Sequence, residues 1–125
     1  EGRAEEFREA GEVIESLMER DYQDDRERAE NFYLAGEYRF RRNEYGPAAS
    51  SYLRAASVMP GNPDFTAQAL YRAALMTRYA GDDRGFTEIL TRLRERFSGS
   101  SWLEAAEELR GENFRGASGL SGGVR

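Results

Sequence analysis

The sequence predicts an all-α protein, and three observations support this prediction. Apolar residues recur every three to four positions in successive blocks, which is the spacing of one helix face. No block alternates polar and apolar residues over the length of a strand. Proline and glycine separate the blocks, and the 125 residues contain only three prolines. We therefore expect about six helices in one domain over residues 1–110.

The expected helices can be delimited by their capping residues. In order, they span residues 4–20, 25–42, 47–58, 64–80, 84–97 and 101–110. Asp24 or Asp25 can cap the second helix, because a carboxylate accepts hydrogen bonds from the free N–H groups of a first turn. Gly81 is placed to end the fourth helix as a C-cap, and Asp82 or Asp83 can cap the fifth.

Proline and serine positions define the remaining boundaries. Pro47 fits a first helical turn, where its missing N–H would be unpaired anyway, and Pro60 ends the same helix. Ser101 and Glu104 have the S-x-x-E spacing of a capping box at the sixth helix. The tail over residues 111–125 is rich in Gly and Ser and has no helical stripe, so we expect it to be flexible.

The composition excludes several classes of function. The chain carries 23 acidic against 18 basic residues, a net charge of −5, which argues against a nucleic-acid binder. It has no Cys and no His, and every basic residue is Arg, so thiolate, Ser–His, Schiff-base and zinc chemistry are not expected. No run of 18 apolar residues occurs, so we expect no membrane insertion. We expect no catalytic residue, cofactor or metal.

Small and aromatic residues in the second and third helices predict a closely packed hairpin. Gly36 opens a gap on one helix, and Ala48 is expected to face it from the other. The rings of Phe32, Tyr45 and Tyr52 would fill the space around this contact. A hairpin of this kind cannot bury its own apolar face and must stack on another hairpin.

These residues resemble the tetratricopeptide repeat. The family pattern W-x2-L-G-x2-Y, A-x3-F and P is met as Phe32-x2-Ala35-Gly36, Ala48-x3-Tyr52 and Pro60. The departures are Ala35 in place of Leu and Arg39 in place of Tyr. A first repeat would cover residues 29–62, a more diverged copy 67–98, and a capping helix 101–110. The resemblance implies a short α-solenoid of antiparallel helical hairpins.

A narrower resemblance concerns the joint before the last helix. The stretch RERFSGSSWLEAAEEL is similar to the R-x-P-x-S-x-[YW]-A-x-x-A joint of tetratricopeptide proteins of the bacterial cell envelope, such as the barrel-assembly lipoprotein and the Tol–Pal coordinator. Ser98 and Ser101 stand where those proteins have proline. This resemblance implies a bacterial protein and favours the cell envelope over the cytoplasm. The alternative is a generic linker in which Phe97 and Trp102 are buried.

The family resemblance also implies a binding groove, which the first helix of each pair lines. The residues expected there are Tyr33, Glu37, Phe40, Arg41, Tyr71, Leu75, Arg78 and Tyr79. Such a mixed aromatic and charged surface is typical of sites for extended or helical peptides. Tyr33 and Glu37 stand where some members place Lys and Asn to bind carboxylates, so that activity is not implied. Alternatively, Tyr33 and Phe40 pack against the helix over 4–20.

The sequence therefore predicts a protein–protein interaction module, an adaptor that presents a concave groove to a peptide or a segment of a partner protein. The alternative is a structural module for homo-oligomerisation, in which the same exposed surface forms a homodimer. An enzyme is not expected, because the acidic pairs of the sequence are not accompanied by a pattern that predicts an apolar pocket.

Overall fold

The computed structural model describes residues 24–58 and 61–111, and all regular structure within these ranges is helical. The helices are α2 (Asp25–Arg41), α3 (Tyr45–Val58), α4 (Pro63–Ala80), α5 (Asp83–Arg96) and α6 (Ser101–Gly111). The all-α prediction is therefore confirmed for this part of the chain. Three expectations lie outside the described residues: the helix over 4–20, Pro60 as a helix stop, and the tail beyond Gly111.

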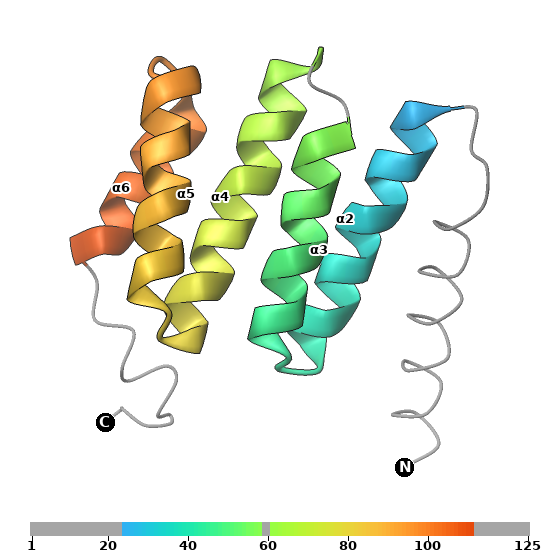
Figure 1. Ribbon diagram of the computed structural model, residues 1–125, viewed down its shortest axis with the longest axis horizontal. Helices are drawn as coiled ribbons and strands as arrows, with labels where there is room; N and C mark the ends of the chain where they lie inside the picture. Colours follow the sequence, from blue (N-terminus) through green and yellow to red (C-terminus); the bar gives the residue numbers. More distant parts are fainter. Residues whose placement is uncertain (1–23, 59–60, 112–125) are drawn as a thin grey trace.

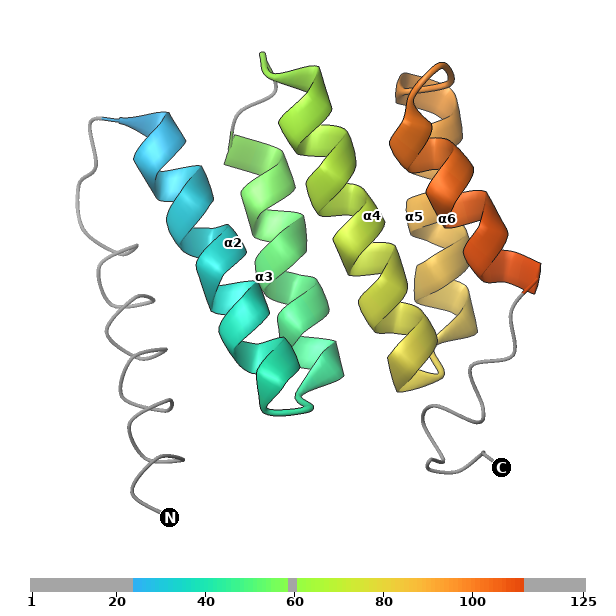
Figure 2. The ribbon, with the colours of Figure 1, turned by 180° about the vertical axis from the view of Figure 1, so that it is seen from behind.

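The helices form two layers, and successive helices run in opposite directions (Figure 1). In Figure 2, α2, α4 and α6 lie in the layer nearer the viewer, with α3 and α5 behind them. α3 contacts both α2 and α4, and α6 contacts both α4 and α5. The hairpins α2–α3 and α4–α5 therefore stack on one another through α3 and α4.

Side-chain caps start three of the helices. Asp24, Asn62 and Asp82 each accept a hydrogen bond from a backbone N–H in the first turn of α2, α4 and α5, at 3.0, 3.2 and 2.9 Å. Each cap satisfies one of the N–H groups that a first turn leaves without a helical partner. Asp24 and Asp82 were expected from the sequence, whereas Asn62 was not. Pro63 follows Asn62 as the first residue of α4, a position that suits proline.

The capping box predicted at Ser101 and Glu104 is not formed, because the cap lies one residue earlier and Leu103 then stands at the position of the glutamate. The backbone N–H of Trp102 donates to the Ser100 hydroxyl at 3.0 Å, so Ser100 caps α6 and Ser101 is its first helical residue. The two hairpin turns use residues with left-handed backbone, Asn43 (φ 62°) and Gly81 (φ 75°). Gly81 is thereby confirmed as the glycine C-cap expected at the end of α4.

The core of the first hairpin is built around Tyr52. This side chain of α3 has no solvent exposure, and its ring packs directly over Gly36 of α2. A Cβ added at Gly36 would lie 2.8 Å from Cε1 of Tyr52. The ring of Tyr52, rather than Ala48, therefore occupies the space that Gly36 opens, which corrects the contact expected from the sequence. Ala48 is buried beside it in the same core.

The second hairpin repeats this pattern with other side chains. Its buried residues include Leu70, Ala73 and Ala74 of α4 and Phe86, Leu90 and Leu93 of α5. The α4 set follows Phe32, Ala35 and Gly36 at a spacing of 38 residues. α6 adds Ala106 and Leu109 to the same core. One continuous core therefore joins all five helices of the described part.

Candidate functional site

The residues predicted for the groove all lie on α2 and α4, which belong to the same layer (Figure 2). Arg41 is exposed, and the other seven are half-buried. They are Tyr33, Glu37, Phe40, Tyr71, Leu75, Arg78 and Tyr79. The five apolar or aromatic members also pack against the core with their inner side. The alternative packing of Tyr33 and Phe40 against the helix over 4–20 falls outside the described residues.

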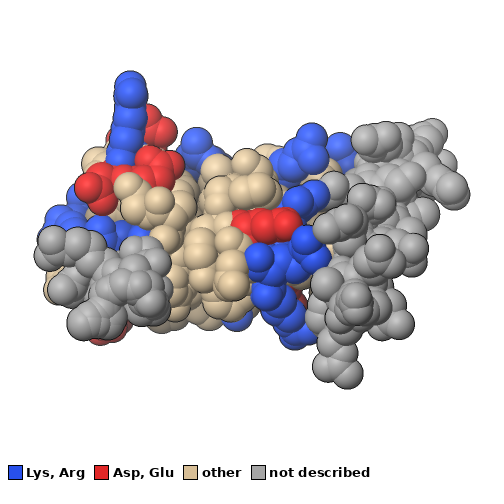
Figure 3. All heavy atoms as spheres, turned by 90° about the horizontal axis from the view of Figure 1, so that it is seen from below, with Lys and Arg blue, Asp and Glu red and all other residues tan. Residues whose placement is uncertain are grey.

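Two of the predicted aromatics meet at the end of the molecule where α2 turns into α3. Phe40 and Tyr79 lie with ring centroids 5.9 Å apart. Tyr45 of α3 joins them, stacked on Tyr79 at 5.1 Å and 6.1 Å from Phe40. Viewed from this end, uncharged residues form a band between two groups of charged side chains (Figure 3). The three rings form an aromatic trio that links α2, α3 and α4.

Tyr33 is the centre of a second group. Its ring meets Tyr52 edge-on, with centroids 5.1 Å apart, and lies 5.8 Å from Phe65 of α4. The side-chain amide of Gln68 donates to the Tyr33 hydroxyl at 3.0 Å. The Arg72 guanidinium lies beside the same hydroxyl. Tyr33 thus ties α2 to both α3 and α4.

The electrostatics of this group follow from partial burial. Burial raises the pKa of Tyr33, while the positive charge of Arg72 acts against this rise. Burial also raises the pKa of Tyr52, with the same opposition from Arg72 and a further rise due to Glu37. For Arg72, burial acts to lower the pKa, but Tyr33, Tyr52 and Glu37 outweigh it and leave the pKa raised. Both tyrosines stay neutral and Arg72 stays charged at ordinary pH.

We call Tyr33, Glu37, Gln68 and Arg72 the polar cluster. The groove residues predicted from the sequence include Tyr33 and Glu37 but not Gln68 or Arg72. A signal for them was present, since residues three or four apart share a helix face, and Gln68, Arg72, Leu75 and Tyr79 form such a series along α4. Within the described residues, Arg72 makes no ion pair with a carboxylate.

The remaining predicted residues have neighbours in the second hairpin and in α6. Tyr71 packs against Trp102 of α6 at 5.5 Å, and the indole N–H of Trp102 donates to Asp64 at 3.2 Å. Arg78 turns toward α5, where its guanidinium lies 5.1 Å from the ring centre of Phe86 and 3.6 Å from the carboxylate of Asp83. Arg78 is therefore held by α5 and does not contribute to the polar cluster.

Two open hollows lie elsewhere on the described surface. The larger, of about 450 Å³, lies between α2 and α3 and is lined by Arg39, Pro47, Ser50, Ser51 and Arg54. The smaller, of about 290 Å³, lies along α5 and includes Arg78 among its lining residues. Within the described part of the chain, no group of three potential metal ligands is found. None of the described helices is long and apolar enough to cross a membrane.

Comparison with protein-family models, with curated proteins and with solved structures found no match. The resemblance to the tetratricopeptide repeat therefore stays a prediction that rests on the motif in the sequence.

Proposed function

We propose that this chain is a protein-binding module and that the face formed by α2 and α4 holds a peptide segment of a partner. The proposal rests on the burial and the charge partners of Arg72. Its guanidinium is half-buried, and no described carboxylate forms an ion pair with it. Partial burial of a charge is costly unless an opposite charge or hydrogen-bond acceptors compensate it. The Tyr33 hydroxyl and the charge of Glu37 supply part of this compensation within the chain, and a carboxylate of a bound peptide adds the ion pair that the described residues do not form.

The surroundings of Arg72 fit a peptide ligand. The exposed Arg41 and the half-buried Glu37 lie on the same face of α2 and offer further polar contacts. The half-buried rings of Tyr33, Tyr71 and Tyr79 present apolar surface with a polar hydroxyl, a combination that is common in protein interfaces. We therefore propose a peptide that carries an acidic residue opposite Arg72 and apolar side chains on either side.

The alternative, homo-oligomerisation, has less support in the described residues. Leu34 is the large hydrophobic side chain that stands exposed there, at 49%. Stable dimer interfaces bury on the order of 800 Å² or more per partner and have an apolar centre. We therefore favour a binding module for a separate partner.

In the experiment, a displayed library of short random peptides is selected for binding to the whole chain. The affinity of individual selected peptides is then measured by fluorescence anisotropy. Arg72→Gln keeps the side-chain length and removes the charge, and we expect it to weaken binding about tenfold or more, as the loss of a charge-assisted hydrogen bond does. Arg92→Gln is the matched control, because Arg92 lies exposed on α5. Equal affinities of wild type and Arg72→Gln, or equal losses in both variants, would overturn the proposal.

A further inference from the structure

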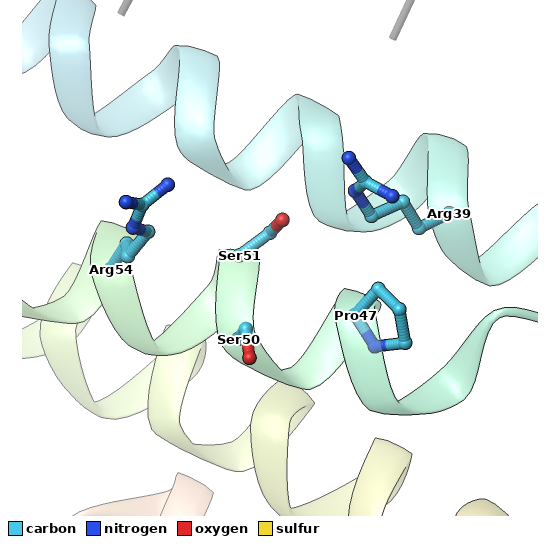
Figure 4. A pocket seen from close by; sticks show the side chains of 5 residues that line it. All are labelled: Arg39, Pro47, Ser50, Ser51 and Arg54. Atoms are coloured by element: carbon cyan, nitrogen blue, oxygen red, sulfur yellow. The ribbon is translucent and has the colours of Figure 1, made fainter. Parts of the chain in front are cut away.

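The hollow between α2 and α3 combines two arginines with the hydroxyl of a largely buried serine. Its volume of about 450 Å³ lies in the range of small-molecule sites, which runs from about 300 to 1,000 Å³. Figure 4 shows Ser51 pointing from α3 toward α2, with Arg54 on one side and Arg39 on the other. Ser50 points away from α2 and contributes only to the wall. The hollow is thus positively charged and has one central hydroxyl.

Ser51 gives the hollow a polar group without an internal partner. The residue is only 5% exposed, and its hydroxyl makes no hydrogen bond within the described chain. Ser57 on the same helix behaves differently, because its hydroxyl donates to the Arg54 carbonyl at 2.8 Å. The Ser51 oxygen itself is not fully enclosed, so solvent or a ligand in the hollow can reach it. The Ser51 hydroxyl is therefore available to a ligand in the hollow.

The two arginines differ in how they are held. Arg54 lies with its guanidinium 5.2 Å from the ring centre of Phe32, and within the described residues it forms no ion pair with a carboxylate. Arg39 is paired with Glu44 at 3.4 Å, and the nearer partner of that carboxylate is Arg42, at 3.0 Å. Arg54 is thus the primary cation of the hollow, and Arg39 adds positive potential from the other side.

We propose that this hollow is a binding site for a phosphate monoester. The planar guanidinium of Arg54 can donate two parallel hydrogen bonds to phosphate oxygens, and the Ser51 hydroxyl can donate a third. The cavity is large compared with the roughly 30 Å³ of a water molecule, so it accommodates part of the organic group that carries the phosphate. The site is separate from the α2/α4 face and does not depend on the function proposed for that face.

The test is a titration of the whole, ¹⁵N-labelled chain, followed by NMR at constant ionic strength. Inorganic phosphate, O-phosphoserine and adenosine monophosphate are the probes. We expect saturable shifts confined to the amides around Ser51 and Arg54. Arg54→Gln should weaken binding about tenfold or more, because it removes a charged hydrogen-bond donor, and Ser51→Ala should weaken it about threefold or more. Arg92→Gln should leave binding unchanged.

The probes also distinguish the two sources of such a phosphate. Tighter binding of O-phosphoserine assigns the site to a phosphorylated side chain of a protein, and tighter binding of adenosine monophosphate assigns it to a nucleotide. Shifts spread over all exposed arginines, no saturation with any probe, or affinities of Ser51→Ala and Arg54→Gln equal to wild type would overturn the proposal. Ser51→Ala is the smaller change, so it keeps the test valid if Arg54→Gln alters the fold, which a thermal melt checks.

Discussion

Replacing Gly36 with Ala places a methyl group against the buried ring of Tyr52. The added carbon would lie 2.8 Å from Cε1 and 2.9 Å from both Cδ1 and Cζ of that ring. Carbon atoms that pack without repulsion are about 3.5–4.0 Å apart, so the ring or the helix must move by roughly 0.7 Å. The side chain of Tyr52 is fully buried, so the ring cannot move out into solvent. The substitution therefore overpacks the contact between α2 and α3.

The expected cost combines two opposing effects. Overpacking a core costs about 1–3 kcal/mol of the free energy of unfolding. Exchanging Gly for Ala inside a helix raises the free energy of unfolding by about 1 kcal/mol. Because three ring atoms of a fully buried side chain are involved, we expect Gly36→Ala to destabilise the protein by about 1–2 kcal/mol. This is a substantial part of the about 5–15 kcal/mol that typically stabilises a domain.

Urea denaturation followed by far-ultraviolet circular dichroism measures this difference. Gly111→Ala is the matched control, because Gly111 is the last residue of α6 and an added Cβ would meet nothing within 4 Å apart from its chain neighbours. The control should raise the stability by up to about 1 kcal/mol. If Gly36→Ala proves as stable as wild type or more so, the close contact between Gly36 and Tyr52 is refuted, and with it the packing of the first hairpin.

Three further predictions concern single side chains. Tyr52→Phe should raise the free energy of unfolding by roughly 1 kcal/mol, because the buried hydroxyl makes no hydrogen bond within the described chain, and a loss in urea denaturation would contradict this. Glu107→Gln should lower the melting temperature at neutral pH, because the hydrogen bond from Arg94 lowers the pKa of Glu107. A lowered pKa stabilises the fold above the unfolded-state pKa, and this stabilisation disappears as the pH falls through the folded-state pKa. The difference in melting temperature should therefore vanish in acid, and exposed Glu108→Gln should show none; equal melting temperatures at neutral pH would refute the ion pair. Tyr79→Ala should cost roughly 1–3 kcal/mol, because it removes the stacked member of the aromatic trio, and unchanged unfolding would disprove that packing.

Helix positions were predictable because local signals determine them. Asp24, Gly81 and Asp82 cap helices as capping preferences predict. For the five helices within the described residues, the predicted ends differ from the observed ones by no more than two residues. The cap of α6 was misplaced because Ser100 and Ser101 are adjacent and equally suited to the role. Only the path of the backbone decides which hydroxyl reaches the free N–H group.

The candidate site was only partly predictable, because its contacts depend on rotamers and on distant residues. Helical spacing identified the face of α2 that carries Tyr33 and Glu37. It could not show that Arg78 turns toward Phe86 on the following helix. Gln68 and Arg72 share the helical spacing of Leu75 and Tyr79, but only their contact with Tyr33 brings them into the site, and that contact depends on how α4 packs across α3.

The most direct test of the proposed function maps a selected peptide onto the chain by NMR. The largest chemical-shift changes should fall on α2 and α4, around Tyr33, Arg72 and Tyr79, and should be lost in Arg72→Gln while the spectrum of the free variant remains that of a folded protein. Changes concentrated on α3 and α5, or a map that Arg72→Gln leaves intact, would contradict the assignment of the binding face to α2 and α4.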